Sequence, residues 1–218
     1  MFNLFNKPNP SISDIEIPSF DWNLTQDTAE LKQWINADQT MAVSINFFNL
    51  KPDLPPLNEI KVVRDYYRKQ LEHANGGLLQ TDLIEINGFK VIKTLFKIQP
   101  DDASLTYLSS LTIPFDSHSY VIKIQAPEYG VTGIRTSVIA DRLLKEKVIL
   151  PSETGYEGWN IDPYDVTLKR ANLMNLSENS EHDDEFPSHP LSMSRKLMTQ
   201  IESELHFNDV LRQLKPYT

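Results

Sequence analysis

The segment of residues 104–126 places the strongest constraint on the fold. Apolar side chains recur at alternate positions in its first half and, after the polar residues 116–118, in its second half. They are Leu105, Tyr107, Leu111, Ile113 and Phe115, then Tyr120, Ile122, Ile124 and Ala126. Alternate residues of an extended chain point to opposite faces, so a period of two marks one apolar face. The segment therefore predicts a β-hairpin with one face in a core.

Three more strands are expected in residues 42–50, 78–86 and 89–98. The first alternates, with Val43, Ile45 and Phe47 on one face. The other two are joined by Asn87 and Gly88, a dipeptide that suits the type I′ turn of a hairpin. Apolar residues occur on both faces of these two strands, which indicates that they lie between layers.

Helical spacing of apolar residues predicts a helix in 57–75, ended by the glycines at 76 and 77, and further helices in 132–147 and 190–206. A short helix is also expected in 25–35, capped by Thr25 or Asp27, with Leu31, Trp34 and Ile35 inside. The proline-rich residues 1–18 are expected to form an arm that is disordered or lies on the surface.

These elements predict an α+β fold, in which an antiparallel meander sheet carries helices on one or both faces. A loop-rich C-terminal extension ends in a helix. We expect residues 1–40 to form the arm and short helix and residues 41–150 to form the α+β core. Residues 151–218 would be an extension whose helix docks on that core, within one domain overall.

The charge balance limits the classes of partner. The 218 residues include 21 basic and 30 acidic side chains, a net charge of −9. A negative field repels phosphate backbones and anionic lipids, so nucleic acid and bare membrane are not expected partners. The absence of cysteine excludes disulfides and thiol catalysis. No secretion signal and no run of 18 apolar residues is evident, so a cytoplasmic protein is expected.

One cluster has the residue types of a metal site. Residues 181–185 and His189 supply imidazole and carboxylate groups, of which His182, Asp183 and His189 are the best candidate ligands for zinc, manganese or iron. The alternative is a solvated acidic loop, with His189 and Pro190 starting the last helix. We favour the loop, and we expect no metal and no cofactor.

Four other residues are candidates for contacts or chemistry. Arg135, at a helix start, could bind a carboxylate or another anion, or form a structural ion pair. His118, in the hairpin turn, could act as a base, although no partner is identified by spacing. Trp159 and Tyr164 belong to an aromatic and acidic stretch typical of binding loops, or else they pack that loop onto the body.

The order of elements resembles the PsbP-like fold of an extrinsic photosystem subunit, a Ran-binding import factor and small bacterial envelope and secretion-associated proteins. The resemblance rests on LLQTDLIEINGFKVIKTLFKI, SLTYLSSLTIPF and SYVIKIQAPEYGVTGIR, and it covers roughly residues 42–147. It implies a protein that binds other proteins or assists assembly.

We therefore expect a non-catalytic module that binds another protein: an adaptor, an assembly factor, an immunity-type protein or a chaperone-like protein. One alternative is a metal-assisted hydrolase built around His182, Asp183 and His189. Another is a carrier that holds a small ligand in a pocket between sheet and helix. A deep cleft with converging polar groups would favour the alternatives, and an exposed aromatic patch would favour the binding module.

Overall fold

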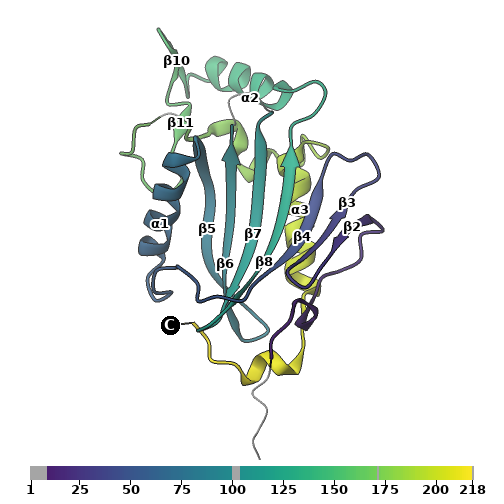
Figure 1. Ribbon diagram of the computed structural model, residues 1–218. Helices are drawn as coiled ribbons and strands as arrows, with labels where there is room; N and C mark the ends of the chain where they lie inside the picture. Colours follow the sequence, from purple (N-terminus) through teal and green to yellow (C-terminus); the bar gives the residue numbers. More distant parts are fainter. Residues whose placement is uncertain (1–8, 100–103, 171, 218) are drawn as a thin grey trace, which may run out of the picture.

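The fold is built around an antiparallel sheet of seven strands (Figure 1). The computed structural model describes residues 9–99, 104–170 and 172–217. The strand order is β2-β3-β4-β8-β7-β6-β5, and each neighbouring pair is antiparallel. The strands are β2 (Asn23–Asp27), β3 (Leu31–Ile35), β4 (Ala42–Phe48), β5 (Gly76–Ile86), β6 (Phe89–Ile98), β7 (Thr106–Pro114) and β8 (Ser119–Pro127). The predicted α+β class with a meander sheet is confirmed.

The hairpin predicted in residues 104–126 is the pair β7 and β8. Leu111 lies opposite Ile122, and Ile113 lies opposite Tyr120. The turn between β5 and β6 has positive φ angles at Asn87 and Gly88, 52° and 87°, as a type I′ turn requires. The strands β5 to β8 are consecutive both along the chain and in the sheet. Strand β4 pairs with the edge of β8 that does not face β7.

In the described part of the chain, three α-helices pack against the sheet or lie at its end (Figure 1). They are α1 (Ile60–His73), α2 (Ile134–Lys145) and α3 (Pro190–Glu204). Helix α3 packs on β7 and β8, α1 packs beside β5, and α2 lies across the end of the sheet where β8 finishes. Among the described residues, no helix combines the length and apolar character that a membrane crossing requires.

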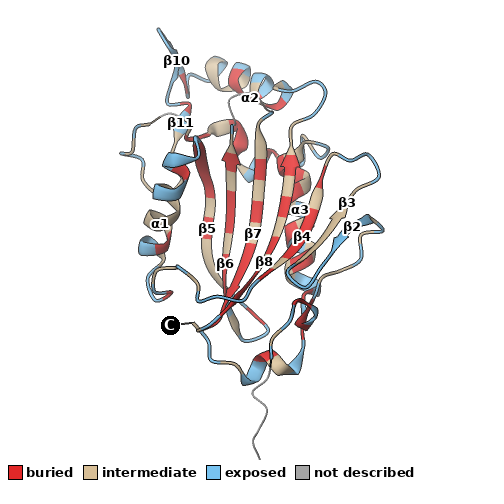
Figure 2. Cartoon of the chain, in the orientation of Figure 1, coloured by how far each residue is buried: buried red, intermediate tan, exposed pale blue. Residues whose placement is uncertain are grey.

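The main core lies between the sheet and α3. Every second side chain of β4, β7 and β8 points into this core. Figure 2 shows the resulting alternation of buried and partly buried residues along the central strands. Buried core residues of these strands include Val43, Ile45, Tyr107, Leu111, Ile113, Ile122 and Ile124. From α3, Leu191, Met198 and Ile201 join them. The alternation of apolar residues in the sequence therefore corresponds to the face of the sheet that α3 covers.

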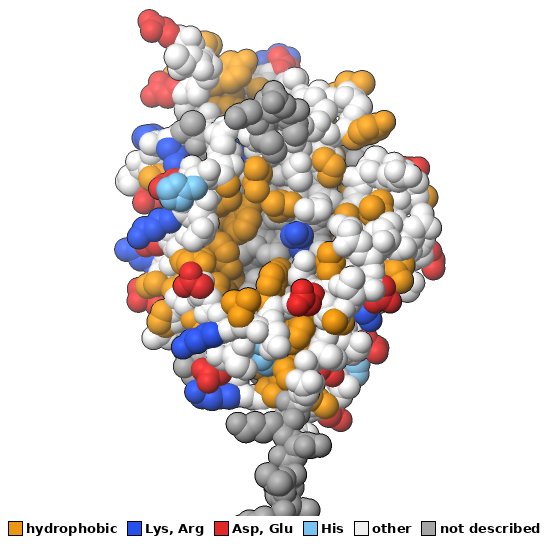
Figure 3. All heavy atoms as spheres, viewed as in Figure 1, with side chains coloured by type: hydrophobic (Ala, Val, Ile, Leu, Met, Phe, Trp, Pro, Cys, Tyr) orange, Lys and Arg blue, Asp and Glu red, His pale blue; other side chains and the backbone are white. Residues whose placement is uncertain are grey.

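The other face of the sheet is covered only in part. Val63 of α1 packs with Ile92 of β6, and the ring of Tyr67 lies 5.4 Å from that of Phe96. Ile92 and Val91 are neighbours in the chain, yet they belong to the two different cores, which shows that α1 and α3 lie on opposite faces. Figure 3 shows this second face, where hydrophobic side chains gather beside α1 and charged side chains lie mostly around the margin.

Short elements connect this framework. Among the described residues, six short strands form three two-stranded sheets. They are β1 (Ile15–Glu16) with β13 (His206–Phe207), β9 (Leu150–Ser152) with β10 (Gly155–Glu157), and β11 (Asn160–Ile161) with β12 (Met174–Asn175). Four 3-10 turns are η1 (Ile12–Asp14), η2 (Leu176–Glu178), η3 (Ser180–His182) and η4 (Asp209–Gln213). Of these, the pieces from β9 to β13 and from η2 to η4 lie in the region after about residue 150 that was expected to be loop-rich.

Two expectations for the N-terminal region are wrong. The helix expected in 25–35 is the hairpin of β2 and β3, because β3 pairs with β4 and places Trp34 opposite Val43. Sheet pairing overrides the helical spacing of its apolar residues. Within the predicted arm, Ile12 and Ile15 are buried in the main core, and the Tyr120 hydroxyl donates a hydrogen bond to the carbonyl oxygen of Ser11. Residues 1–8 of the arm lie outside the described residues.

Replacing Ile122 with alanine tests the central hairpin. The side chain is fully buried, so its loss should lower the free energy of unfolding by about 2–5 kcal/mol. Val121→Ala is the matched control, because Val121 is the next residue and points to the partly covered face. Chemical denaturation should show a much smaller loss for the control, and equal losses would contradict the assigned faces.

Candidate interaction site

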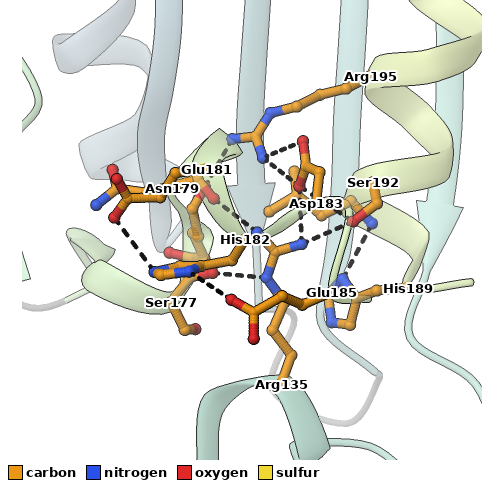
Figure 4. Close-up of polar contacts among 12 residues, drawn as sticks. Arg135, Ser177, Asn179, Glu181, His182, Asp183, Glu185, His189, Ser192 and Arg195 are labelled. Atoms are coloured by element: carbon orange, nitrogen blue, oxygen red, sulfur yellow. Dashed lines mark hydrogen bonds and ion pairs between the residues drawn. The ribbon is translucent and has the colours of Figure 1, made fainter. Parts of the chain in front are cut away.

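Four residues singled out from the sequence converge where α2 and α3 begin (Figure 4). Arg135 lies in the first turn of α2, His182 and Asp183 lie at the end of η3, and His189 is the N-terminal cap of α3. Residues 135 and 183 are 48 positions apart in the chain, so the fold and not the local sequence brings them together.

Arg135 is a buried anchor of this cluster. Its guanidinium donates hydrogen bonds to the carbonyl oxygens of Ser177 at 2.6 Å and Asn179 at 2.8 Å. It also donates to the Asp183 carboxylate at 2.9 Å and to the Ser192 hydroxyl at 2.8 Å. The carboxylate contact considered for Arg135 is therefore made within the chain, and it ties α2 to the loop before α3.

Asp183 lies between two guanidinium groups. Arg195 of α3 donates to both of its carboxylate oxygens, at 2.9 and 3.1 Å, and Figure 4 shows Arg135 and Arg195 approaching Asp183 from opposite sides. Arg195 also donates to the carbonyl oxygen of Glu178 at 2.6 Å. Burial lowers the pKa of Arg195, while the negative charge of Asp183 opposes that shift. The carboxylate of Asp183 thus holds the guanidinium groups of Arg135 and Arg195, which are largely removed from water, in place.

Glu178 extends the polar network to the sheet. It accepts from the Lys97 ammonium at 2.7 Å and from the Tyr107 hydroxyl at 3.2 Å. Burial, followed by the charges of Glu178 and Glu128, raises the pKa of Tyr107 well above its ordinary value, so the hydroxyl remains a donor. Sequence reasoning did not single out Lys97 or Glu178. A signal existed, since Lys97 occupies a core-facing position two residues after Leu95.

His189 connects α3 to the end of β8. Its Nδ1 accepts a hydrogen bond from the backbone N–H of Leu191 at 3.2 Å. An accepting Nδ1 leaves the proton of a neutral imidazole on Nε2. That Nε2 lies 3.3 Å from the carboxylate of Glu128, and the Tyr107 hydroxyl, whose shorter contact is with Glu178, lies 3.4 Å from the same carboxylate. Glu128 is therefore contacted by an imidazole and a phenolic hydroxyl, and by no lysine or arginine among the described residues.

The three candidate metal ligands have separate partners. Asp183 binds the two arginines, His189 faces Glu128, and His182 lies 3.4 Å from Glu181 and 3.5 Å from Glu185. In the described part of the chain, no group of three or more such residues is placed to hold a metal ion.

Glu185 belongs to an exposed ion pair. Arg142 of α2 donates to its two carboxylate oxygens at 2.9 and 2.5 Å. The hydrogen bonds from Arg142 lower the pKa of Glu185 to about 2. The charge of Glu185 is therefore matched within the chain.

Trp159 and Tyr164 have packing contacts inside the protein. Trp159 is buried with Ile139 and Ile149 in a small core under α2. The hydroxyl of Tyr164 accepts a hydrogen bond from the backbone N–H of Thr81 at 2.8 Å, and the Arg64 guanidinium lies 3.5 Å from its ring centre. Both contacts attach the long loop to the body, which was the alternative considered for these aromatics.

His118 lies at the opposite end of the hairpin from Glu128. It is buried, and its ring stacks on Phe115 with centroids 4.7 Å apart. Burial lowers the pKa of His118, although Asp14 opposes the shift. Its Nε2 has no hydrogen-bond partner among the described residues. The aromatic surroundings give this histidine a packing role in the core.

An open pocket adjoins the polar cluster. It has a volume of about 390 Å³ and lies between residues 128–135 and residues 185–190. Three exposed apolar side chains line it, Tyr129 with 79% exposure, Val131 with 82% and Ile134 with 54%, and Val138, one helical turn after Ile134, is 43% exposed. We call these four residues the α2 surface. Figure 3 shows exposed hydrophobic groups at the upper right, where the loop between β8 and α2 runs.

A larger cavity of about 680 Å³ lies near the turn between β5 and β6. Its charged residues include Glu85 and Lys90, which lie opposite each other in the β5–β6 pair, and Arg212, whose side chain is 3.5 Å from Asp209. This cavity is lined by none of the candidate ligand or contact residues Arg135, His118, Trp159, Tyr164, His182, Asp183 and His189. The α2 end therefore combines more of the features expected of a site.

Comparison with known proteins supports the fold. No protein-family model and no curated protein sequence matches the chain. Among solved structures, a mutant of protein Mog1 is 13% identical over 92% of this chain and 94% of its own, with a TM-score of 0.50. The Saccharomyces cerevisiae Ran-binding protein Mog1p is 12% identical over 91% and 93%, with a TM-score of 0.49. At this identity the likeness concerns the fold alone, and it agrees with the resemblance to PsbP-like proteins.

Removing the carboxylate of Asp183 should destabilise the protein strongly. Asp183→Ala leaves Arg135 and Arg195 without their shared anion, and an uncompensated buried charge typically costs about 3–5 kcal/mol. Asp184→Ala is the matched control, because Asp184 is the next residue and is exposed. Thermal and chemical unfolding should separate the two variants, and a loss below about 1 kcal/mol for Asp183→Ala would contradict the anchoring role.

His118 should make stability depend on pH. Its pKa is below the ordinary value of 6.5 in the folded protein, so the unfolded chain binds the proton more readily. The contribution of neutral His118 is complete above pH 6.5 and is lost as pH falls from there toward the folded pKa. His118→Phe should remove this part of the pH dependence in urea unfolding curves. Parallel curves for wild type and variant between pH 7 and pH 5 would show that His118 does not titrate differently on folding.

Proposed function

We propose that this protein is a non-catalytic module that binds another protein through the α2 surface. The observation that carries this proposal is the joint exposure of Tyr129, Val131, Ile134 and Val138 on one short stretch of chain. Single apolar residues at a surface are ordinary, whereas a contiguous apolar patch marks a contact site.

The surroundings suit a preformed interface. The β8–α2 loop ends at Gly133, and the four hydrogen bonds of Arg135, in the first turn of α2, hold the start of this helix against the loop before α3. A partner would thus meet a surface that is already ordered, which reduces the entropy lost on binding. Burial of the four side chains would contribute roughly 25 cal/mol for each Å² of apolar area removed from water.

The charge of the chain favours a partner of a particular kind. With a net charge of −9, two copies of this protein repel each other at long range. A protein with basic residues around an apolar contact face is attracted instead. One solved structure with a similar fold is a Ran-binding protein, so a Ran-type GTPase is a defined protein to test first. Adaptor, assembly-factor, immunity-type and chaperone-like roles are all forms of this proposal.

Making the α2 surface polar should weaken binding of the partner protein. A native-cell extract is passed over immobilised wild type and Val131→Asp, and the protein retained by wild type is purified and titrated against both. We expect Val131→Asp to bind at least tenfold more weakly, because a buried unpaired carboxylate costs more than about 1.4 kcal/mol. The purified Ran-type GTPase is titrated in the same way.

Val166→Asp is the matched control, since Val166 is also a valine with 77% exposure but lies in the loop after Tyr164. It should bind the partner as wild type does. Equal binding by all three proteins would contradict the assignment of the interface to the α2 surface, and a wild type that elutes as a dimer through this surface would replace the partner with a second copy.

A further inference from the structure

The pocket at the α2 surface holds a carboxylate that no lysine or arginine of the described residues contacts. Besides Glu128, the charged or titratable residues that line it are Tyr129, Arg135, Glu185 and His189. Arg135 is paired with Asp183, and Glu185 is paired with Arg142. Glu128 has no lysine or arginine partner among the described residues, and its polar side-chain contacts are with the His189 imidazole and the Tyr107 hydroxyl.

The walls of the pocket are apolar. Val131 and Ile134 line it from the side of α2, while Phe186, Pro187 and Pro190 line it from the side of α3. Glu128 is the first residue after β8, and its side chain lines the pocket and is 11% exposed, so the carboxylate is reachable. A pocket that combines these apolar residues with a carboxylate that no lysine or arginine contacts suits a ligand with an apolar stem and a cationic tip.

We infer that this pocket receives a lysine or arginine side chain of the protein partner, with the cationic group against Glu128. The aliphatic stem of such a side chain packs along apolar walls while its charged end reaches a polar group. A charge-assisted hydrogen bond to a carboxylate is stronger than a neutral one. The inference rests on the proposed function for the source of the side chain, but the chemistry of the pocket is testable separately.

The position of the pocket makes it a determinant of specificity. Val131 and Ile134 belong both to the α2 surface and to the pocket lining, so a docked partner lies directly over the opening. A partner without a basic side chain at this place would bury the Glu128 carboxylate without a cation, which penalises the wrong partner. The apolar surface then supplies binding energy, and the pocket selects among apolar partners.

The test uses two small probes that differ in charge and not in shape. N-acetyl-arginine methylamide and the corresponding citrulline compound are titrated into the isotope-labelled full chain, and backbone amide shifts are followed by NMR. We expect arginine to shift amides of residues 128–134 and 186–191, and citrulline to bind roughly tenfold more weakly because it lacks the charge.

Two variants identify the carboxylate. Glu128→Gln keeps the size of the side chain and should make the two probes bind equally. Glu185→Gln is the matched control, because it removes a carboxylate from the same pocket whose charge is already met by Arg142, and it should preserve the preference for arginine. Amide spectra and thermal unfolding check that both variants are folded.

Equal binding of arginine and citrulline to wild type would overturn the inference, whatever the variants do. A preference that survives Glu128→Gln would overturn the assignment to Glu128. If Val131→Asp loses the partner while the probes show no preference, the proposed function stands and this inference fails. If the probes behave as expected while Val131→Asp keeps the partner, the pocket chemistry stands and the proposed interface fails.

Discussion

The ion pairs of Asp183 with Arg135 and Arg195 are the interaction on which the arrangement of the α2 end depends. One carboxylate joins the first turn of α2 to the body of α3, and the same arginines bind carbonyl oxygens of the intervening loop. Charges buried in this way are costly unless each is paired and hydrogen-bonded, so the cluster permits few alternative arrangements. It thereby determines where the β8–α2 loop lies, and with it the exposed apolar residues.

The α2 end is coupled to the sheet as well. Glu178 accepts from Lys97 of β6 and Tyr107 of β7, so the loop before α3 is attached to the core face of the sheet. The Tyr107 hydroxyl also lies 3.4 Å from Glu128, so a residue that lines the pocket adjoins the same network. The rigid sheet therefore supports a surface formed by loops, which is a common arrangement in proteins that recognise other proteins.

Most of the sheet was predictable because its strands have a local signature. The alternation in residues 104–126 and the Asn87–Gly88 turn are properties of neighbouring residues, and both appear in the structure as expected. The hairpin of β2 and β3 was missed because its strands are stabilised by pairing with β4, and its own residues have helical spacing. The burial of Ile12 and Ile15 was missed for a similar reason, since it depends on contacts with distant parts of the chain.

The candidate site was predictable only in part. Residue types indicated Arg135, Asp183, His182 and His189, but spacing along the chain did not reveal that Arg195 and Glu178 complete the cluster. The exposed residues Tyr129 and Val131 have no pattern that distinguishes them from core residues in the sequence. Their exposure depends on where the β8–α2 loop is held.

The central claim is that a partner protein contacts the α2 surface in the cell. Site-specific photocrosslinking tests it most directly, with a benzophenone amino acid placed at residue 131 in one strain and at residue 166 in another. Both positions are highly exposed, so reactivity with solvent and small proteins should be alike. The account predicts one dominant crosslinked protein at 131 and none at 166. No crosslink at 131, or the same products at both positions, would contradict it.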